Sequence, residues 1–173
     1  MKNIAILGLG NISYELCSRL IKKGFNVFGS TDNYDRKALL KKIGVKVSGR
    51  NNIHECILKA DKLIITIPPD SSGCIIIRNY FKEILDSKIK WIGYLSSTSV
   101  YGNYDGEEVN ENSALRPKEL VEKYRAKAEK DIEDFGKKYS ITVEIFRLSG
   151  IYGNSRSIIN QILNKKVKLI FKE

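Results

Sequence analysis

The sequence predicts an α/β fold in a single domain: a doubly wound parallel sheet between two layers of helices. Apolar runs that suit buried strands alternate with helical patterns along the chain. Two of these runs, Lys62–Ile67 and Trp91–Leu95, show no polar alternation, as expected for strands buried on both faces. The length of 173 residues suits one domain with a real core.

The first thirty residues justify the first two strands and the helix between them. Lys2–Leu7 is a short apolar run, and a glycine-rich turn follows it at once. A helical pattern then runs to Gly24, and Phe25–Phe28 forms a second apolar run. This order of strand, helix and strand predicts the βαβ start of a parallel sheet.

The later elements follow from the same patterns. Pro68-Pro69 ends the fourth strand, because proline cannot continue a ladder. The last helix has its apolar residues on one stripe, and Pro117 suits its first turn. The polar loop Tyr101–Leu115 follows a strand end, where open α/β sheets place ligands. Strands are expected at 2–7, 25–30, 45–47, 62–67, 90–95 and 141–147, and helices at 11–23, 34–43, 51–59, 73–87 and 117–138.

The turn Gly8–Ser13 is typical of a Rossmann-type nucleotide site. Gly8 permits a tight turn out of the strand, and Gly10 has no Cβ to keep a pyrophosphate from the helix N-terminus. Ser13 stands where a third glycine is usual. The string alone is weak, but its place between strand and helix is informative. An α/β domain that keeps the turn without the ligand is the alternative.

The end of the second strand indicates which dinucleotide fits. An NAD site usually has Asp or Glu there to bond the ribose 2′-hydroxyl, whereas this chain has Ser30 and Thr31, with Arg36 a turn later. Small hydroxyls and a cation suit a 2′-phosphate, so NADP is favoured. A shift of two residues would put Asp32 at the strand end and restore an NAD-type contact. Alternatively, Ser30 and Thr31 only cap the next helix.

The formal charge of +10 raises the question of nucleic acid. The lysines are spread along the sequence, and the densest cluster is Lys165, Lys166, Lys168 and Lys172. No helix-turn-helix, zinc or RNA-binding signature accompanies these lysines. A high content of Lys, Ile and Asn can also reflect the base composition of the gene. A solvated surface is therefore the expectation, and nucleic acid is not an expected partner.

The remaining sequence features indicate no further functional site. Cys17, Cys56 and Cys74 have no metal or redox spacing, which predicts reduced thiols and a cytoplasmic location. His54 is expected to face solvent, and no metal site is predicted. The start of the chain does not read as a signal peptide, and no apolar run is long enough to span a bilayer.

Three blocks together resemble the NAD(P)-dependent epimerase/dehydratase branch of the short-chain dehydrogenase/reductases, and its atypical members most. They are Gly8–Ser13, Tyr94–Gly102 and Phe146–Gly153. The resemblance implies a cofactor site formed by Gly8, Gly10, Asn11, Ile12, Ser30, Thr31, Arg36, Pro68 and Ser96.

The resemblance also implies a catalytic set of Ser, Tyr and Lys, of which only the serine is matched, at Ser97. Alignment on the trailing glutamate, Glu129, puts Val121 at the Tyr position and Arg125 at the Lys position. Valine cannot transfer a proton, and arginine stays charged at ordinary pH. Tyr124 is out of register, since its lysine would have to stand four residues on.

These observations predict an NADP-binding, dehydrogenase-like or epimerase-like domain at 1–153 with a degenerate active site. Residues 154–173 would be the remnant of a substrate-binding lobe, with a helix at Ser155–Asn164 and an edge strand at Val167–Phe171 that pairs into a weak homodimer. One alternative is an active NADP-dependent reductase or epimerase on a sugar-nucleotide-like or small carbonyl substrate. The other is a basic module that binds nucleic acid or a partner protein.

Overall fold

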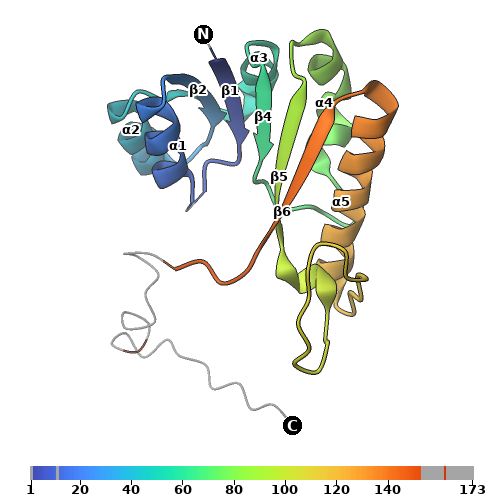
Figure 1. Ribbon diagram of the computed structural model, residues 1–173. Coiled ribbons are helices and arrows are strands. Elements are labelled where there is room, and N and C mark those ends of the chain that lie inside the picture. The colour runs from blue at the N-terminus through green and yellow to red at the C-terminus, as the bar shows by residue number, and fades with distance from the viewer. Residues whose placement is uncertain (1, 11, 153–161, 163–173) are drawn as a thin grey trace.

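Six parallel strands form one sheet in the order β3-β2-β1-β4-β5-β6 in the computed structural model, which describes residues 2–10, 12–152 and 162 (Figure 1). The strands are β1 (Lys2–Leu7), β2 (Phe25–Ser30), β3 (Lys46–Ser48), β4 (Lys62–Ile65), β5 (Trp91–Ser97) and β6 (Thr142–Leu148). The helices are α1 (Ser13–Lys22), α2 (Tyr34–Lys42), α3 (Ile53–Leu58), α4 (Ile75–Asp86) and α5 (Leu120–Tyr139), with short 3₁₀ turns η1 (Arg50–Asn52) and η2 (Thr98–Tyr101). The predicted doubly wound α/β/α class is confirmed.

The strand order reverses direction at β1. The chain moves outward from β1 through β2 to β3, then crosses back so that β4 lies on the other side of β1. Leu7 pairs with both Ser30 and Ile65, so the carboxyl ends of β1, β2 and β4 meet at one point. Open α/β sheets bind their ligands at such a reversal.

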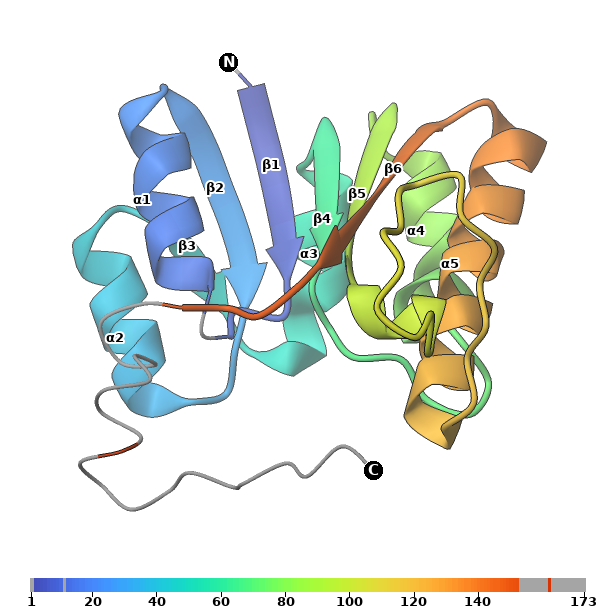
Figure 2. The same ribbon diagram turned by 60° about the horizontal axis from the view of Figure 1, so that its bottom comes forward.

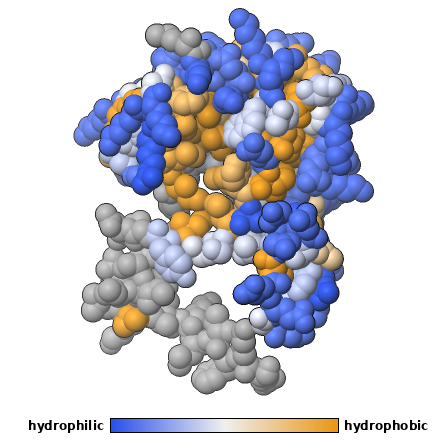
Figure 3. Space-filling view, in the orientation of Figure 1, coloured by the Kyte–Doolittle hydropathy of each residue, from blue (hydrophilic) through white to orange (hydrophobic). Residues whose placement is uncertain are grey.

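Two helix layers cover different parts of the sheet (Figures 1 and 2). One apolar core joins α1 and α2 to β1–β3, and a larger one joins α3, α4 and α5 to the opposite face. Where β4–β6 face the α1 side, no helix of the described chain covers them, and apolar side chains reach the surface (Figure 3). Phe146 on β6 is 40% exposed there.

The last helix begins later than the sequence predicts. Pro117 lies outside α5, because Glu122 accepts hydrogen bonds from the backbone N–H groups of Lys118 and Glu119 at 2.8 and 3.1 Å. This capping box with Glu119 fixes the first helical residue as Leu120. The other predicted bounds agree with the structure to within three residues.

Some predictions fall on residues that the structure does not describe. Asn11, the edge strand Val167–Phe171 and the dimer that it would form lie outside the described residues, as does the helix Ser155–Asn164 apart from Ile162. Among the described helices, none has the length and apolar character needed to cross a bilayer.

Gly136 sets how closely α5 packs on β6, and it generates a stability test. A Cβ at this position would overlap Val143 and lie 2.8 Å from the carbonyl oxygen of Ile141. Gly136→Ala should therefore destabilise the domain by about 1–3 kcal/mol through overpacking, although alanine favours an open helix by about 1 kcal/mol. Urea unfolding measures the change. Ala126→Gly on the same helix is the propensity control, and a stabilised Gly136→Ala protein would contradict the packing.

Candidate functional site

The glycine turn after β1 is braced by the end of β4. Gly8 has a φ of +99°, and a Cβ on it would lie 2.5 Å from Thr66 Oγ1 and 2.9 Å from the backbone nitrogen of Ile67. The Thr66 hydroxyl hydrogen-bonds to the carbonyl groups of Gly8 and Leu7. Glycine is therefore required at position 8 both by its conformation and by the closeness of its neighbours.

Space remains beside the next glycine, where a pyrophosphate is expected. The nearest heavy atom to a Cβ on Gly10 would be the carbonyl oxygen of Gly8, at 3.7 Å. Ile12 is the N-cap of α1, and its apolar side chain cannot bond the first helical N–H groups. Ser13, at the third glycine position, is buried and donates to the Gly8 carbonyl at 3.3 Å. The turn is thus closed by a hydroxyl, and the N-cap side chain makes no hydrogen bond to the first turn of α1.

A pocket of about 630 Å³ opens at the carboxyl ends of β1, β2 and β4. It contains six residues that the sequence predicts for the cofactor: Gly8, Gly10, Ser30, Thr31, Arg36 and Pro68. Sequence reasoning missed the other walls, which come from the turn after β4, from the η1 and α3 region and from α4: Asn51, Ile53, Thr66, Ile67, Ile75, Ile76, Asn79 and Tyr80. Polar atoms at the turn and apolar side chains opposite suit a nucleotide.

Arg36 brings a cation to the glycine turn. Its guanidinium donates to the carbonyl oxygen of Leu9 at 3.1 Å, so the side chain folds back from α2 over the pocket. Asn33, not Ser30 or Thr31, caps α2, since its Oδ1 accepts the Arg36 N–H at 2.8 Å. The alternative reading of Ser30 and Thr31 as helix caps is therefore wrong.

Asp32 follows Thr31 but is not part of the pocket wall. Its Oδ1 lies 3.7 Å from where a Cβ on Gly49 would stand, on the side of the loop after β3. This placement leaves Arg36 as the charged side chain in the pocket wall among the described residues.

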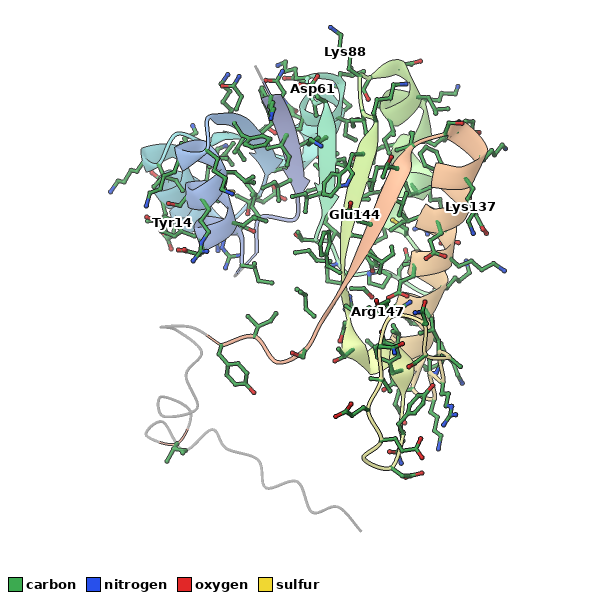
Figure 4. All side chains as sticks on the ribbon, in the orientation of Figure 1. Tyr14, Asp61, Lys88, Lys137, Glu144 and Arg147 are labelled. Carbon is green, nitrogen blue, oxygen red and sulfur yellow. The ribbon has the colours of Figure 1, made fainter. Side chains whose placement is uncertain are left out.

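A buried ion pair lies beyond β5, on the α5 side of the sheet. Arg147 binds Glu129 with distances of 3.2 and 3.0 Å from Nε and Nη2, and the two side chains are 17% and 3% exposed. Burial alone lowers the pKa of Arg147, but its hydrogen bonds with Glu129 and Tyr101 raise that pKa above its ordinary value. Ser96 donates its hydroxyl to the same glutamate. Arg147 is labelled in Figure 4 near the carboxyl end of β6.

The residues expected for catalysis do not form a proton-transfer set. Ser97 lies at the end of β5, and its Oγ accepts the N–H of Ser99 at 3.2 Å. Val121, which the resemblance puts at the Tyr position, is 65% exposed on the first turn of α5. Arg125 is close enough to favour the charged form of Tyr94, yet burial raises the pKa of that tyrosine to about 12. No group of metal-ligating side chains gathers anywhere in the described residues.

This chain is similar in sequence to known proteins. Residues 3–76 match the family described as NADP oxidoreductase, coenzyme F420-dependent. The chain is 30% identical to Protein YeeZ of Escherichia coli K12 over 90% of its own length, and it spans 61% of that relative. The fold is of the Rossmann type. The matched segment begins at the second residue of β1 and contains the glycine turn and the strands β2, β3 and β4.

Solved structures support the same fold over nearly the whole chain. A conserved protein of unknown function from Silicibacter pomeroyi DSS matches with a TM-score of 0.84 and 26% identity, over 94% of this chain and 57% of that one. UDP-glucuronic acid 4-epimerase from Bacillus cereus, solved with NAD, matches with a TM-score of 0.77 and 17% identity, over 94% and 63%. At that identity, the epimerase shows the fold alone.

The Glu129–Arg147 pair generates a double-mutant test. Glu129→Ala should destabilise the domain by about 3–5 kcal/mol, because it leaves the Arg147 charge buried without its partner. Replacing both, as Glu129→Leu with Arg147→Met, should cost several kcal/mol less than the sum of the losses in Glu129→Leu alone and Arg147→Met alone. Chemical denaturation measures the original protein, each single variant and the double variant.

A surface ion pair on α1 is the matched control. Arg19 lies 2.7 Å from Glu15, with both side chains more than half exposed. Glu15→Ala should cost less than about 1 kcal/mol. Similar losses at the two sites would show that burial does not strengthen the Glu129 pair.

Proposed function

We propose that this domain binds a nicotinamide dinucleotide at the carboxyl ends of β1, β2 and β4, and prefers NADP(H) to NAD(H). One observation carries the preference: the Arg36 guanidinium lies over the glycine turn while Asp32 stays out of the pocket wall. The family match to NADP oxidoreductases supports a nicotinamide dinucleotide.

Each wall of the pocket suits a different part of this ligand. The pyrophosphate would lie against Gly10 and the N-terminus of α1, where free N–H groups and the helix dipole favour an anion. The adenosine 2′-phosphate would lie near Ser30, Thr31 and Arg36, and the adenine against the apolar side chains of Ile53 and Pro68. A guanidinium can bond a phosphate through two N–H groups, which makes the contact specific.

The catalytic proposal is a degenerate member of the atypical short-chain dehydrogenase/reductases, similar to epimerases and dehydratases. When bound, the dinucleotide supplies hydride chemistry. The Ser97 Oγ accepts a hydrogen bond from the Ser99 N–H. The Ser97 hydroxyl can therefore still donate its own proton to a hydrogen bond that orients a substrate carbonyl oxygen. Val121 supplies no acid, and Tyr94 keeps its proton at neutral pH. An active reductase or epimerase on a small carbonyl or sugar-nucleotide-like substrate is the second candidate, favoured by Ser97 alone.

The dinucleotide preference is tested by titration calorimetry. NADPH should bind about tenfold or more tightly than NADH, since hydrogen bonds to a charged group contribute about 1.5–3 kcal/mol. Arg36→Met should remove most of this difference and leave NADH affinity nearly unchanged. Lys41→Met, at the other end of α2, is the control variant that loses the same charge outside the pocket. Equal affinities for NADPH and NADH would remove the 2′-phosphate contact, and binding of neither would remove the proposed function.

The degenerate site is tested by NADPH oxidation with aldehydes, ketones and sugar nucleotides. Turnover should be undetectable or very slow, because acid–base catalysis typically supplies a factor of about 10² to 10⁴ that Val121 cannot provide. Ser97→Ala measures the background. Robust turnover that disappears in Tyr124→Phe would show that the helix is aligned wrongly and that the second candidate is correct.

A further inference from the structure

The fold gathers lysines at the end of the sheet opposite the dinucleotide pocket. All six strands are parallel, so every strand starts at this end and all five helices finish there. We define the strand-start face as residues 2, 22–25, 41–46, 59–62, 86–91 and 137–142. Its lysines are Lys2, Lys22, Lys23, Lys41, Lys42, Lys46, Lys59, Lys62, Lys88, Lys90, Lys137 and Lys138.

This face holds the entire net charge of the chain. The chain has 30 Lys and Arg against 20 Asp and Glu, for a formal charge of +10. The face contains twelve lysines and two aspartates, Asp61 and Asp86, which leaves eighteen residues of each sign for all other positions. Figure 4 labels Lys88 and Asp61 at this end, with Arg147 far from it. Lysines that are scattered in sequence are therefore concentrated in space.

The lysines are exposed and mostly without acidic partners. Eleven of the twelve are exposed, and Lys62 is half-buried over the Trp91 ring at 5.1 Å. Lys59 pairs with Glu55 at 3.4 Å, and no other lysine of the face makes an ion pair within the described residues. The Asp61 carboxylate is occupied by the backbone N–H of Asn3 at 2.9 Å.

Helix dipoles do not account for this concentration. Five helix C-termini carry about half a negative charge each, or about two to three charges together, against an excess of ten positive charges. Lys2, Lys46 and Lys62 begin strands, where no helix end needs neutralising. A gene base composition that favours lysine codons explains how many lysines there are. It does not explain why all other positions together carry equal numbers of positive and negative residues.

One loop at the opposite end is acidic. The loop between η2 and α5 carries Asp105, Glu107, Glu108 and Glu111, all exposed, and lies beyond the carboxyl end of β5 (Figure 1). This loop would repel a polyanion, whereas the strand-start face would attract one.

We propose that the strand-start face binds the phosphate backbone of nucleic acid without reading its sequence. The six strands span about 24 Å, roughly seven base pairs of a duplex. All twelve cations are lysines, which contact phosphates as point charges, and the face carries no arginine that could pair with guanine. Its aromatic rings lie under lysines, as Phe25 under Lys2 at 5.8 Å, rather than projecting as membrane-inserting residues do.

Fluorescence anisotropy with labelled 20-nucleotide duplex and single-stranded DNA of mixed sequence tests the proposal between 50 and 300 mM NaCl. Lys22→Gln/Lys88→Gln/Lys137→Gln should weaken duplex binding at least about tenfold and lower the salt slope by about three. The matched control is Lys118→Gln/Lys123→Gln/Lys130→Gln, whose lysines are exposed outside the face. It loses the same charge and should change affinity less than about twofold.

Further arms separate charge from folding and from other anions. The arginine version, Lys22→Arg/Lys88→Arg/Lys137→Arg, should bind like the original protein, and circular dichroism checks that every variant folds. Equal losses in the two glutamine variants would overturn the proposal, because net charge alone would then explain binding. Binding to vesicles of phosphatidylcholine and phosphatidylglycerol without binding to DNA would overturn it in favour of a membrane surface.

Discussion

The common direction of the six strands is the constraint on which both ends of this molecule depend. Parallel pairing of β1 with β2 and with β4 holds three carboxyl ends together, so the glycine turn, Ser30 and Thr66 share one pocket. The same pairing forces every helix to return to the opposite end before the next strand begins. Ligand chemistry and positive charge are therefore separated by the length of the strands.

Elements and glycine-turn residues could be predicted because their signals are local. The strands Lys2–Leu7 and Phe25–Ser30 match their predicted bounds. Each is an apolar run next to a glycine, Gly8 after the first and Gly24 before the second. Pro117 was misleading because Glu119 and Glu122 form the stronger start signal three residues later. The NADP preference and the cofactor roles of all the predicted site residues remain predictions: Gly8, Gly10, Asn11, Ile12, Ser30, Thr31, Arg36, Pro68 and Ser96.

The parts that could not be predicted depend on contacts between distant residues. Thr66 braces Gly8 from 58 positions away, and Glu129 meets Ser96 from 33 positions away. Neither contact leaves a periodic pattern in the sequence. The gathering of lysines was missed for the same reason, because each connection contributes only one to three of them. Their common end follows from strand order, which no local segment reveals.

The single tryptophan of the chain, Trp91, stands at the start of β5. Its ring lies across Gly93, whose Cβ would be 3.1 Å from two ring carbons, and beneath the Lys62 ammonium. Indole emission responds to nearby charge and to water. The intrinsic fluorescence of this protein is thus a label-free optical signal from one known position, on the uncovered half of the sheet and at its lysine-rich end, while the pocket wall at the other end contains no indole.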